Sequence, residues 1–326
     1  MNESIQEKER REGALYAGGV TFYFFITVVH FFWAISGPLT KMSYAGLGIS
    51  GVDVLEIIHF AGIRLLGAGL IGLAYCRLRG TRLLPEHLSD LWQLTKLGLM
   101  MGVAQYIFFN FGAAFSSGVQ TSILSSAGAF FGILISAFLF REDALTGRKI
   151  TGCILGVFAV VILNWEDIRQ GAAASLFGAL LLLLGQLSGS LGAAYLKIIS
   201  RGRSAIWVGG WQSVISGALL VMIGALGGGA CSFTAGSAAL LPTAVLVLTS
   251  GAALIFSNQL YKYNPLSKVM IFSLLSPVLG VFSSAIMLGD SLRSGYVFAS
   301  LIINCLGVAL VTTEKPTKMH ETHRNF

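Results

Sequence analysis

Two stretches of this 326-residue sequence decide its fold. Residues 107–147 read IFFNFGAAFSSGVQTSILSSAGAFFGILISAFLFREDALTG, and residues 255–295 read IFSNQLYKYNPLSKVMIFSLLSPVLGVFSSAIMLGDSLRSG. They align without a gap at an offset of 148 residues. The matched pairs include Phe108 with Phe256, Asn110 with Asn258, Ser125 with Ser273, Gly132 with Gly280, and Gly147 with Gly295. The alignment predicts an internal repeat.

The composition is that of a protein that lies in lipid. Of all residues, 55% are hydrophobic and only 11% are charged, whereas soluble domains carry about 25% charged residues. Mean hydropathy is +0.76. The net charge of +7 does not indicate nucleic-acid binding, because the basic residues lie in short loops and form no stripe. We therefore expect an all-α polytopic membrane protein.

The cysteines and the N-terminal residues fit the same class. Cys76, Cys153, Cys231 and Cys305 lie in or beside apolar segments, and no C-x-x-C pair occurs. Neither a disulfide framework nor a metal site is predicted. Residues 1–13 carry charges of both signs and lead into an apolar run. This pattern indicates a soluble leader before a first transmembrane helix, not a cleaved signal peptide.

Ten apolar runs are long enough to cross a bilayer, which needs about 20 residues of helix. With the N-terminus inside, eighteen Lys and Arg residues fall on the cytoplasmic side, three fall outside, and Arg64 lies within a span. This bias fits the positive-inside rule and places both termini in the cytoplasm. The predicted spans are residues 20–40, 53–75, 95–115, 119–140, 147–165, 175–199, 205–227, 241–261, 266–288 and 295–313.

The repeat and the span count together predict inverted halves. Each half holds five spans, and since five is odd, the second half enters the membrane from the opposite side. Such repeats are typical of secondary transporters. We expect ten transmembrane helices as two inverted five-helix repeats. The expected units are a cytoplasmic leader (1–19), a first repeat (20–165), an external linker (166–174), a second repeat (175–313) and a cytoplasmic tail (314–326).

The second half carries a pattern known from one family. Residues 276–311 read SPVLGVFSSAIMLGDSLRSGYVFASLIINCLGVALV, with Pro277 inside the ninth span and Leu-Gly-Asp closing it. Residues 31–41 read FFWAISGPLTK. With the five-plus-five arrangement, these features resemble the EamA-type transporters of the drug/metabolite transporter superfamily. The resemblance implies a metabolite transporter in the cytoplasmic membrane, although Ala129 stands where a first-half proline would be.

Polar and aromatic residues gather near the middle of the predicted spans. A helix rises 1.5 Å per residue, so a residue ten positions into a span lies roughly 15 Å deep. Transporter sites form at this depth between repeats, and polar groups there must face a cavity or one another. The candidate substrate-binding residues are His30, Trp33, Arg64, Gln105, Tyr106, Gln186, Trp211, Gln212, Ser273 and Pro277.

Arg64 is the sharpest of these candidates. A guanidinium near the midplane is unfavourable in lipid and stays charged. It therefore either binds an anionic group of a solute or braces helices. His30 is either a core histidine or a proton carrier, the aromatic residues are packing or pocket residues, and the glutamines bond across helices or line the site. Pro277 removes the amide that would bond the carbonyl of Ser273, which predicts a kink.

Four further residues are candidates for coupling or gating: Glu56, His59, Asn110 and Asn258. Glu56 lies about 5 Å from the outer end of its span, where it is either an interfacial carboxylate or part of a pathway. The same two alternatives, packing and pathway, apply to His59 one turn deeper. Two acidic residues at span ends, Glu142 and Asp290, are expected in loop or gate salt bridges.

The function that these patterns predict is secondary transport of a small organic metabolite by alternating access. We expect an amino acid or a related amphipathic solute, because the site mixes aromatic rings, amides and one Arg. No G-x-x-x-x-G-K-[ST], H-E-x-x-H or G-x-S-x-G motif occurs, so no ATPase, enzyme activity or cofactor is expected. The alternatives are an intramembrane enzyme and a channel or scaffold. Expected partners are the solute and membrane lipids, with a homodimer left open.

Overall fold

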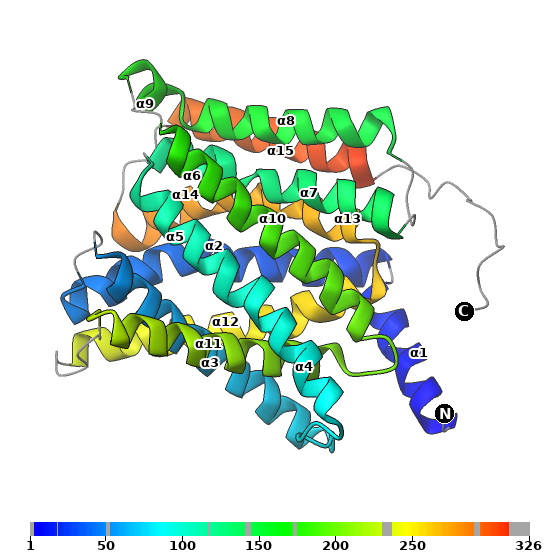
Figure 1. The fold of residues 1–326 in the computed structure, drawn as a ribbon. Helices are drawn as coiled ribbons and strands as arrows, with labels where there is room; N and C mark the ends of the chain where they lie inside the picture. Colours follow the sequence, from blue (N-terminus) through cyan, green and yellow to red (C-terminus); the bar gives the residue numbers. More distant parts are fainter. Residues whose placement is uncertain are drawn as a thin grey trace.

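The computed structural model describes residues 3–17, 19–49, 53–116, 118–140, 145–171, 175–229, 237–289 and 294–312. All regular elements within these ranges are helices, and most run along a common direction (Figure 1). The helices α1 and α4 lie at one end of the bundle and α9 lies at the other (Figure 1). Glu142 and Asp290, with the salt bridges predicted for them, fall outside the described residues.

Helices occupy all ten predicted apolar runs. The first half contains α1 (Glu3–Ala17), α2 (Gly19–Leu47), α3 (Val54–Leu78), α4 (Leu88–Leu97), the π-helical segment η1 (Gly98–Ala104), α5 (Gln105–Ala114), α6 (Gly118–Ser125), α7 (Ala127–Ile135), the π-helical segment η2 (Ser136–Phe140), α8 (Gly147–Leu163) and α9 (Trp165–Arg169). The second half contains α10 (Leu176–Ile199), α11 (Ala205–Leu226), α12 (Ser237–Tyr263), α13 (Leu266–Met270), the 3₁₀ segment η3 (Ile271–Leu274), α14 (Leu275–Leu288) and α15 (Ser294–Thr312).

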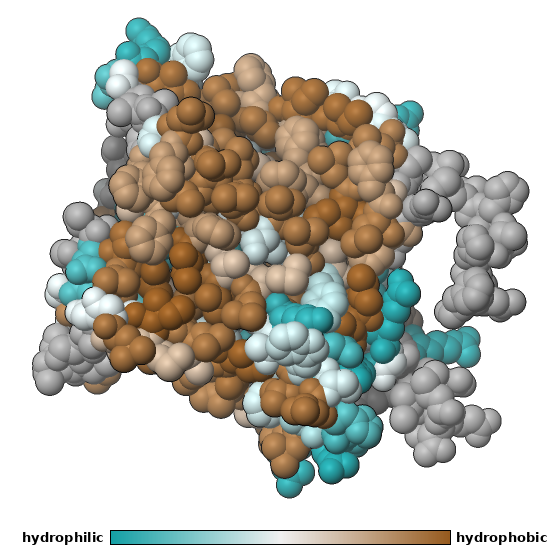
Figure 2. Space-filling view, viewed as in Figure 1, coloured by the Kyte–Doolittle hydropathy of each residue, from teal (hydrophilic) through white to brown (hydrophobic). Residues whose placement is uncertain are grey.

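Eight helical stretches in the described chain are long and apolar enough to cross a membrane. They coincide with eight of the ten predicted spans. The remaining two, α8 and α15, are shorter: α8 has 17 residues, and the apolar part of α15 is Gly295–Val311. Hydrophobic residues cover most of the face in Figure 2, while hydrophilic residues gather near α9 and around α4. A multi-pass membrane protein follows from this arrangement.

Short polar side chains begin several of these helices. Asp53 Oδ1 accepts from the backbone amides of Leu55 and Glu56, at 2.9 and 3.3 Å, at the start of α3. Ser175 Oγ accepts from the amide of Gly178 at 3.0 Å and so caps α10. Each cap satisfies an amide that has no partner within its own helix.

Helices that are equivalent under the repeat pack directly on each other. An offset of 148 residues carries α3 onto α11 and α8 onto α15, and each of these two pairs is in contact. In the first pair, Gly62 lies against Val221 and Gly69 lies against Val214. Residue numbers therefore rise in α3 as they fall in α11, so the two helices are antiparallel. This geometry relates the halves by inversion, as the odd number of predicted spans requires.

The remaining contacts repeat in the same way. The helix α2 packs on α12 and α14, and its counterpart α10 packs on α5 and α7. Glycines at four-residue spacing let these helices approach closely. Gly98 and Gly102 lie against α11, and Gly185 and Gly189 lie against the turn of α5 that begins at Gln105. The contact pattern is therefore that of one five-helix unit used twice.

Both halves interrupt the same helix at equivalent places. In the second half, the 3₁₀ segment η3 separates α13 from α14, just before Pro277. In the first half, α6 ends at Ser125 and α7 begins at Ala127. Since Ala129 occupies the position equivalent to Pro277, the first break forms without a proline. Ser126 Oγ instead donates to the carbonyl of Ile123 at 2.5 Å, a local bond that competes with the helical pattern.

We expect the α3–α11 contact to tolerate no added methyl group. A Cβ on Gly62 would lie 2.5 Å from the backbone nitrogen of Val221, and one on Gly217 would lie 2.5 Å from that of Leu66. Backbone atoms cannot swing away as side chains can, so Gly62→Ala and Gly217→Ala should each destabilise the fold by about 1–3 kcal/mol.

The measurement is the melting temperature of the detergent-purified protein by tryptophan fluorescence. Gly19→Ala is the matched control, because a Cβ there meets nothing within 4 Å. Equal melting temperatures for Gly62→Ala and Gly19→Ala would contradict the close approach of α3 and α11.

Candidate functional site

Arg64 lies where helices of both halves meet. Its Nε donates to Ser250 Oγ of α12 at 2.8 Å. Its guanidinium carbon lies 5.5 Å from the ring centroid of Trp33 on α2, within the range of a cation–π contact. The residue is partly buried, and its Nη2 atom is buried with no hydrogen-bond partner among the described residues.

Ser250 fixes the direction of this guanidinium. The Ser250 hydroxyl donates to the carbonyl of Leu246 at 2.6 Å, which leaves its lone pairs to accept from Arg64 Nε. The stacked ring of Trp33 and this bond hold one edge of the guanidinium and leave Nη2 as a donor without an acceptor. A buried donor of this kind is unfavourable until an acceptor arrives, and a carboxylate matches the Arg fork.

His30 joins the two halves near the same place on α2. Its Nδ1 lies 2.9 Å from Ser276 Oγ of α14, and its ring stacks on Phe272 at a centroid distance of 6.5 Å. His30 and Trp33 are three residues apart on α2, so their side chains lie near one another on the helix. The structure therefore brings three predicted site residues, His30, Trp33 and Arg64, to one region between α2, α3, α12 and α14.

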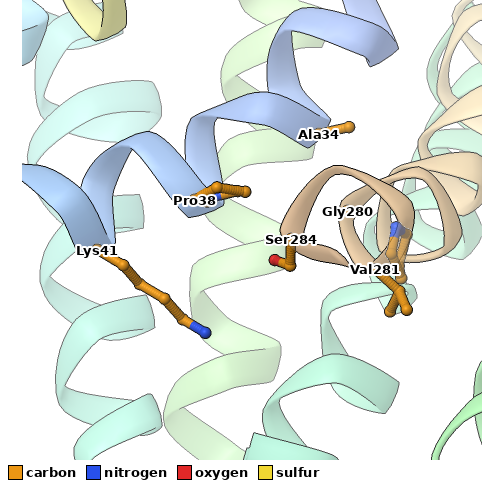
Figure 3. Close-up of a pocket in the computed structure, with 8 residues that line it drawn as sticks. Ala34, Pro38, Lys41, Gly280, Val281 and Ser284 are labelled. Atoms are coloured by element: carbon orange, nitrogen blue, oxygen red, sulfur yellow. The ribbon is translucent and has the colours of Figure 1, made fainter. Parts of the chain in front are cut away.

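A cavity of about 340 Å³ opens beside this region, between α2 and α14. Figure 3 shows its walls: Pro38 and Lys41 on one helix face Ser284 and Val281 on the other. The lining residues are Ala34, Gly37, Pro38, Lys41, Pro277, Gly280, Val281 and Ser284. Among them only Pro277 was predicted as a site residue, and it lies next to Ser276, the partner of His30.

The predicted residues of the central helices contact neighbouring helices. Gln105 packs on Gly189 of α10, and Gln186 packs on Gly128 of α7. Tyr106 packs in a hydrophobic cluster with Ile58 and Leu65 of α3 among others. These three side chains therefore lie at interfaces between α5, α10, α7 and α3, and their part in substrate binding stays a prediction.

Trp211 and Gln212 lie elsewhere on α11. The indole of Trp211 donates to the carbonyl of Leu83 at 2.8 Å, and the indole of Trp207 donates to the same oxygen at 2.7 Å. Gln212 Nε2 donates to Ser216 Oγ at 3.0 Å within its own helix. Depth alone placed these two residues with Arg64, but their hydrogen bonds face the segment after α3 and the interior of α11.

The predicted gating residues divide between caps, packing and unpaired amides. Glu56 belongs to the first turn of α3, and His59 is buried against Gly224. Asn110 Nδ2 donates to the carbonyl of Tyr106 at 2.8 Å. Its repeat equivalent, Asn258, is 2% exposed, and its Nδ2 has no hydrogen-bond partner in the described part of the chain.

The break at Pro277 has its carbonyls partly satisfied by side chains. Ser273 Oγ donates to the carbonyl of Met270 at 2.7 Å, and Asn304 Nδ2 of α15 donates to the carbonyl of Leu274. The predicted kink is confirmed as a short 3₁₀ segment, η3, directly before the turn that contains Pro277. The proline supplies no amide, so this segment cannot form a continuous α-helical ladder.

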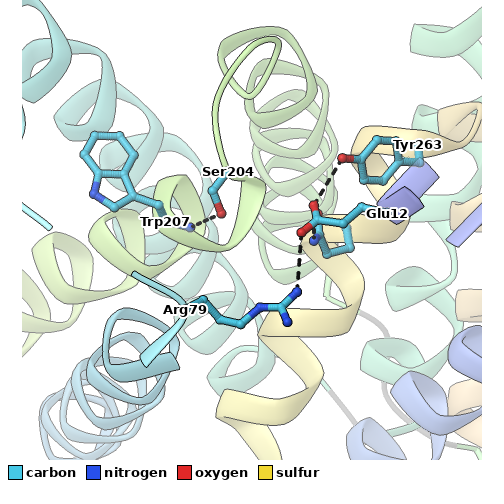
Figure 4. Close-up of polar contacts among 6 residues, drawn as sticks. Glu12, Arg79, Ser204, Trp207 and Tyr263 are labelled. Atoms are coloured by element: carbon cyan, nitrogen blue, oxygen red, sulfur yellow. Dashed lines mark hydrogen bonds and ion pairs between the residues drawn. The ribbon is translucent and has the colours of Figure 1, made fainter. Parts of the chain in front are cut away.

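The end of the bundle near α1 is tied together by polar contacts that the sequence did not reveal. Glu12 of α1 lies 3.8 Å from Arg79 Nη2 at the end of α3 and accepts from Tyr263 OH at 3.3 Å (Figure 4). It also accepts from Gln259 Nε2 at 3.2 Å. One carboxylate of the leader thus bridges α3 and α12.

Other residues were missed although a signal existed. Ser250 falls near mid-depth of its predicted span, as Arg64 does, and Ser276 precedes Pro277. Serine is common in membrane helices, so depth alone does not single it out. In the described residues, no three His, Cys, Asp or Glu side chains gather as a metal site would need.

A sequence model of the EamA-like transporter family matches residues 20–165 and 176–313, which is most of the chain and one match for each half. The chain belongs to the EamA-like transporter family. As a member, it transports small solutes across a membrane and is a multi-pass protein.

Relatives agree with this assignment. The chain is 25% identical over 287 residues to the uncharacterized transporter YvbV of Bacillus subtilis (strain 168), covering 86% of this chain and 88% of that protein. It is 21% identical over 276 residues to YoaV, an uncharacterized transporter of the same organism, covering 80% and 89%. A crystal structure with 18% identity has the same fold at a TM-score of 0.70, covering 88% of this chain and 96% of that one.

We expect Pro277→Ala to slow transport without preventing insertion. Alanine restores the amide that can bond the carbonyl of Ser273, and this straightens the segment beside the cavity. Initial uptake rates in proteoliposomes, at equal reconstitution, measure the effect.

Pro242→Ala is the matched control for this variant. Pro242 lies in α12 and outside the cavity lining. If both variants transport at the wild-type rate, the break at Pro277 has no part in the transport cycle.

Proposed function

We propose that this chain is a secondary transporter for small organic solutes that carry a carboxylate, such as amino acids or related amphipathic metabolites. Transport runs by alternating access of two inverted five-helix halves across the cytoplasmic membrane. In this proposal α8 and α15 also cross the bilayer as an antiparallel pair, which gives ten spans. Their mutual packing supports this, since Gly152 lies against Val311 and Gly307 lies against Leu155.

The guanidinium of Arg64 is the single observation that carries the substrate class. It combines a fixed positive charge, a stacked indole from Trp33, an orienting bond from Ser250, and one buried nitrogen without an acceptor. A carboxylate would accept from that nitrogen and neutralise the charge in a region of low dielectric. The neighbouring aromatic rings suit the apolar part of an amphipathic solute.

Closure at one end and an opening nearer the other support alternating access. Glu12 bridges Arg79 and Tyr263 at the α1 end, and Arg203 Nη2 lies 2.6 Å from Asp90 Oδ1 there. The cavity between α2 and α14 lies on the far side of the His30–Ser276 contact from that end. An outward-facing state combines these two features, and the exchange of open and closed ends by two inverted units gives the opposite state.

We expect both termini in the cytoplasm. Eighteen of the 22 Lys and Arg residues fall on that side in the ten-span arrangement. A reporter fused after residue 320 should read as cytoplasmic, and one inserted within residues 227–237 should read as external. An external reading after residue 320 would remove one span from the proposal and place α8 or α15 at the surface.

We expect Arg64 to set the affinity for a carboxylate solute. A thermal-shift screen of metabolites on the purified protein first identifies a solute, because a bound ligand stabilises the native state. Arg64→Lys should weaken binding of that solute, since a point charge cannot form the bidentate pair. Arg64→Gln should weaken it further, by about 10- to 100-fold for a lost charged hydrogen bond of 1.5–3 kcal/mol.

Arg77→Gln, the same change at an exposed position of α3, is the matched control. An amide analogue of the solute should bind wild type and Arg64→Gln about equally. Wild-type affinity of Arg64→Gln for the carboxylate solute would make Arg64 a brace between helices. Uptake that does not saturate would favour a channel, and turnover of a hydrolase probe would favour an enzyme.

A further inference from the structure

The cavity between α2 and α14 is kept open by two glycines. A Cβ on Gly37 or on Gly280 would meet nothing within 4 Å, although both residues line the cavity. Glycines elsewhere in the chain close helix contacts: a Cβ on Gly62 would lie 2.5 Å from a neighbouring backbone nitrogen. Gly37 and Gly280 therefore do not serve tight packing, and they leave free volume on facing walls of the cavity.

The lining has one sign of charge. Lys41 is the only charged residue among the eight, and none of the eight is acidic. Ser284 supplies the only other polar side chain, and Figure 3 shows its hydroxyl and the Lys41 ammonium at the space between the two helices. Ala34, Pro38 and Val281 make the wall beside them apolar. An ammonium and a hydroxyl beside an apolar wall suit an amphipathic anion.

The cavity and the Arg64 region lie in sequence along α2. Lys41 is eight residues from Trp33, roughly 12 Å along the helix axis, and Trp33 contacts Arg64. The contact between His30 and Ser276 joins α2 to α14 just beneath the cavity. Two cationic side chains, Lys41 and Arg64, are thus spaced along one helix, and a joint between the halves lies close to the second.

We propose that this cavity is an outer anion subsite, in which Lys41 and Ser284 hold the carboxylate of an amphipathic solute before it reaches Arg64. Gly37 and Gly280 provide the room for the apolar body of the solute. The subsite rests on the proposed function, because it takes the same solute class from the external side. It adds a second binding position and a place where the solute is selected by charge.

Charged thiol reagents test the subsite without knowledge of the solute. Ser284→Cys is made in a chain whose four native cysteines are replaced by alanine or serine. Its reaction rate is measured with the anionic sulfonatoethyl and the cationic trimethylammonium-ethyl methanethiosulfonates, each divided by its rate with 2-mercaptoethanol. We expect the anionic-to-cationic ratio to exceed one, and Lys41→Gln to lower it about tenfold, because the reagents differ by two unit charges near one ammonium.

Three further variants define the result. Lys41→Arg should retain the ratio, and Arg77→Gln, at the opposite end of α3, should leave it unchanged. Gly280→Leu should slow both reagents about tenfold, because the new side chain fills the cavity, whereas Gly19→Leu, which adds the same side chain in open space, should not. A ratio that Lys41→Gln does not move, or equal rates in Gly280→Leu and Gly19→Leu, would overturn the subsite.

Uptake separates this proposal from the proposed function. Proteoliposomes are given a ¹⁴C-labelled amino-acid mixture, and we expect Lys41→Gln to raise the KM several-fold with little change in kcat. Arg64→Gln should abolish uptake and leave the thiol ratio intact. Absence of uptake by the wild type would count against the proposed amino-acid substrates alone, while an unchanged KM in Lys41→Gln would overturn the subsite alone.

Discussion

Backbone contact between α3 and α11 is the constraint on which the other helices depend. In lipid, apolar side chains gain little by leaving one hydrocarbon environment for another, so close packing must hold helices together. Gly62, Gly69 and Gly217 allow that approach. Because one face of α3 is committed to α11, the face that carries Arg64, Gly67 and Ile71 turns to α12, where Ser250, Val247 and Gly251 receive it. The position of Arg64 follows from glycines that never contact it.

The helices and their repeat could be predicted from the sequence because both depend on composition and spacing. Ten apolar runs became helical segments, and the 148-residue offset became a pattern of paired contacts. Length was less informative at α8 and α15, which are too short to be recognised as spans by apolar length alone. The break at Ser126 was also not foreseen, since without a proline it depends on a serine hydroxyl that bonds its own backbone.

Depth in the membrane found only part of the site, because it says nothing about the direction of a side chain. Arg64 and Trp211 were both placed in the site from their depth, yet Arg64 turns to Ser250 and Trp211 turns to Leu83. The direction is set by neighbours far away in the sequence. Glu12 makes this plainest: it accepts from Gln259, 247 residues away, and nothing local in a charged leader predicts such a contact.

The two halves share a topology but differ in the chemistry of their broken helices. At Pro277 the missing amide makes the break permanent, whatever surrounds it. At Ser126 every amide is present, so a continuous helix is available once the hydroxyl releases the carbonyl of Ile123. The energetic difference between straight and broken forms is therefore smaller in the first half. Two inverted units that exchange conformations need not be equal partners: here the half with the serine can change its helix, while the half with the proline lines the cavity with a fixed shape.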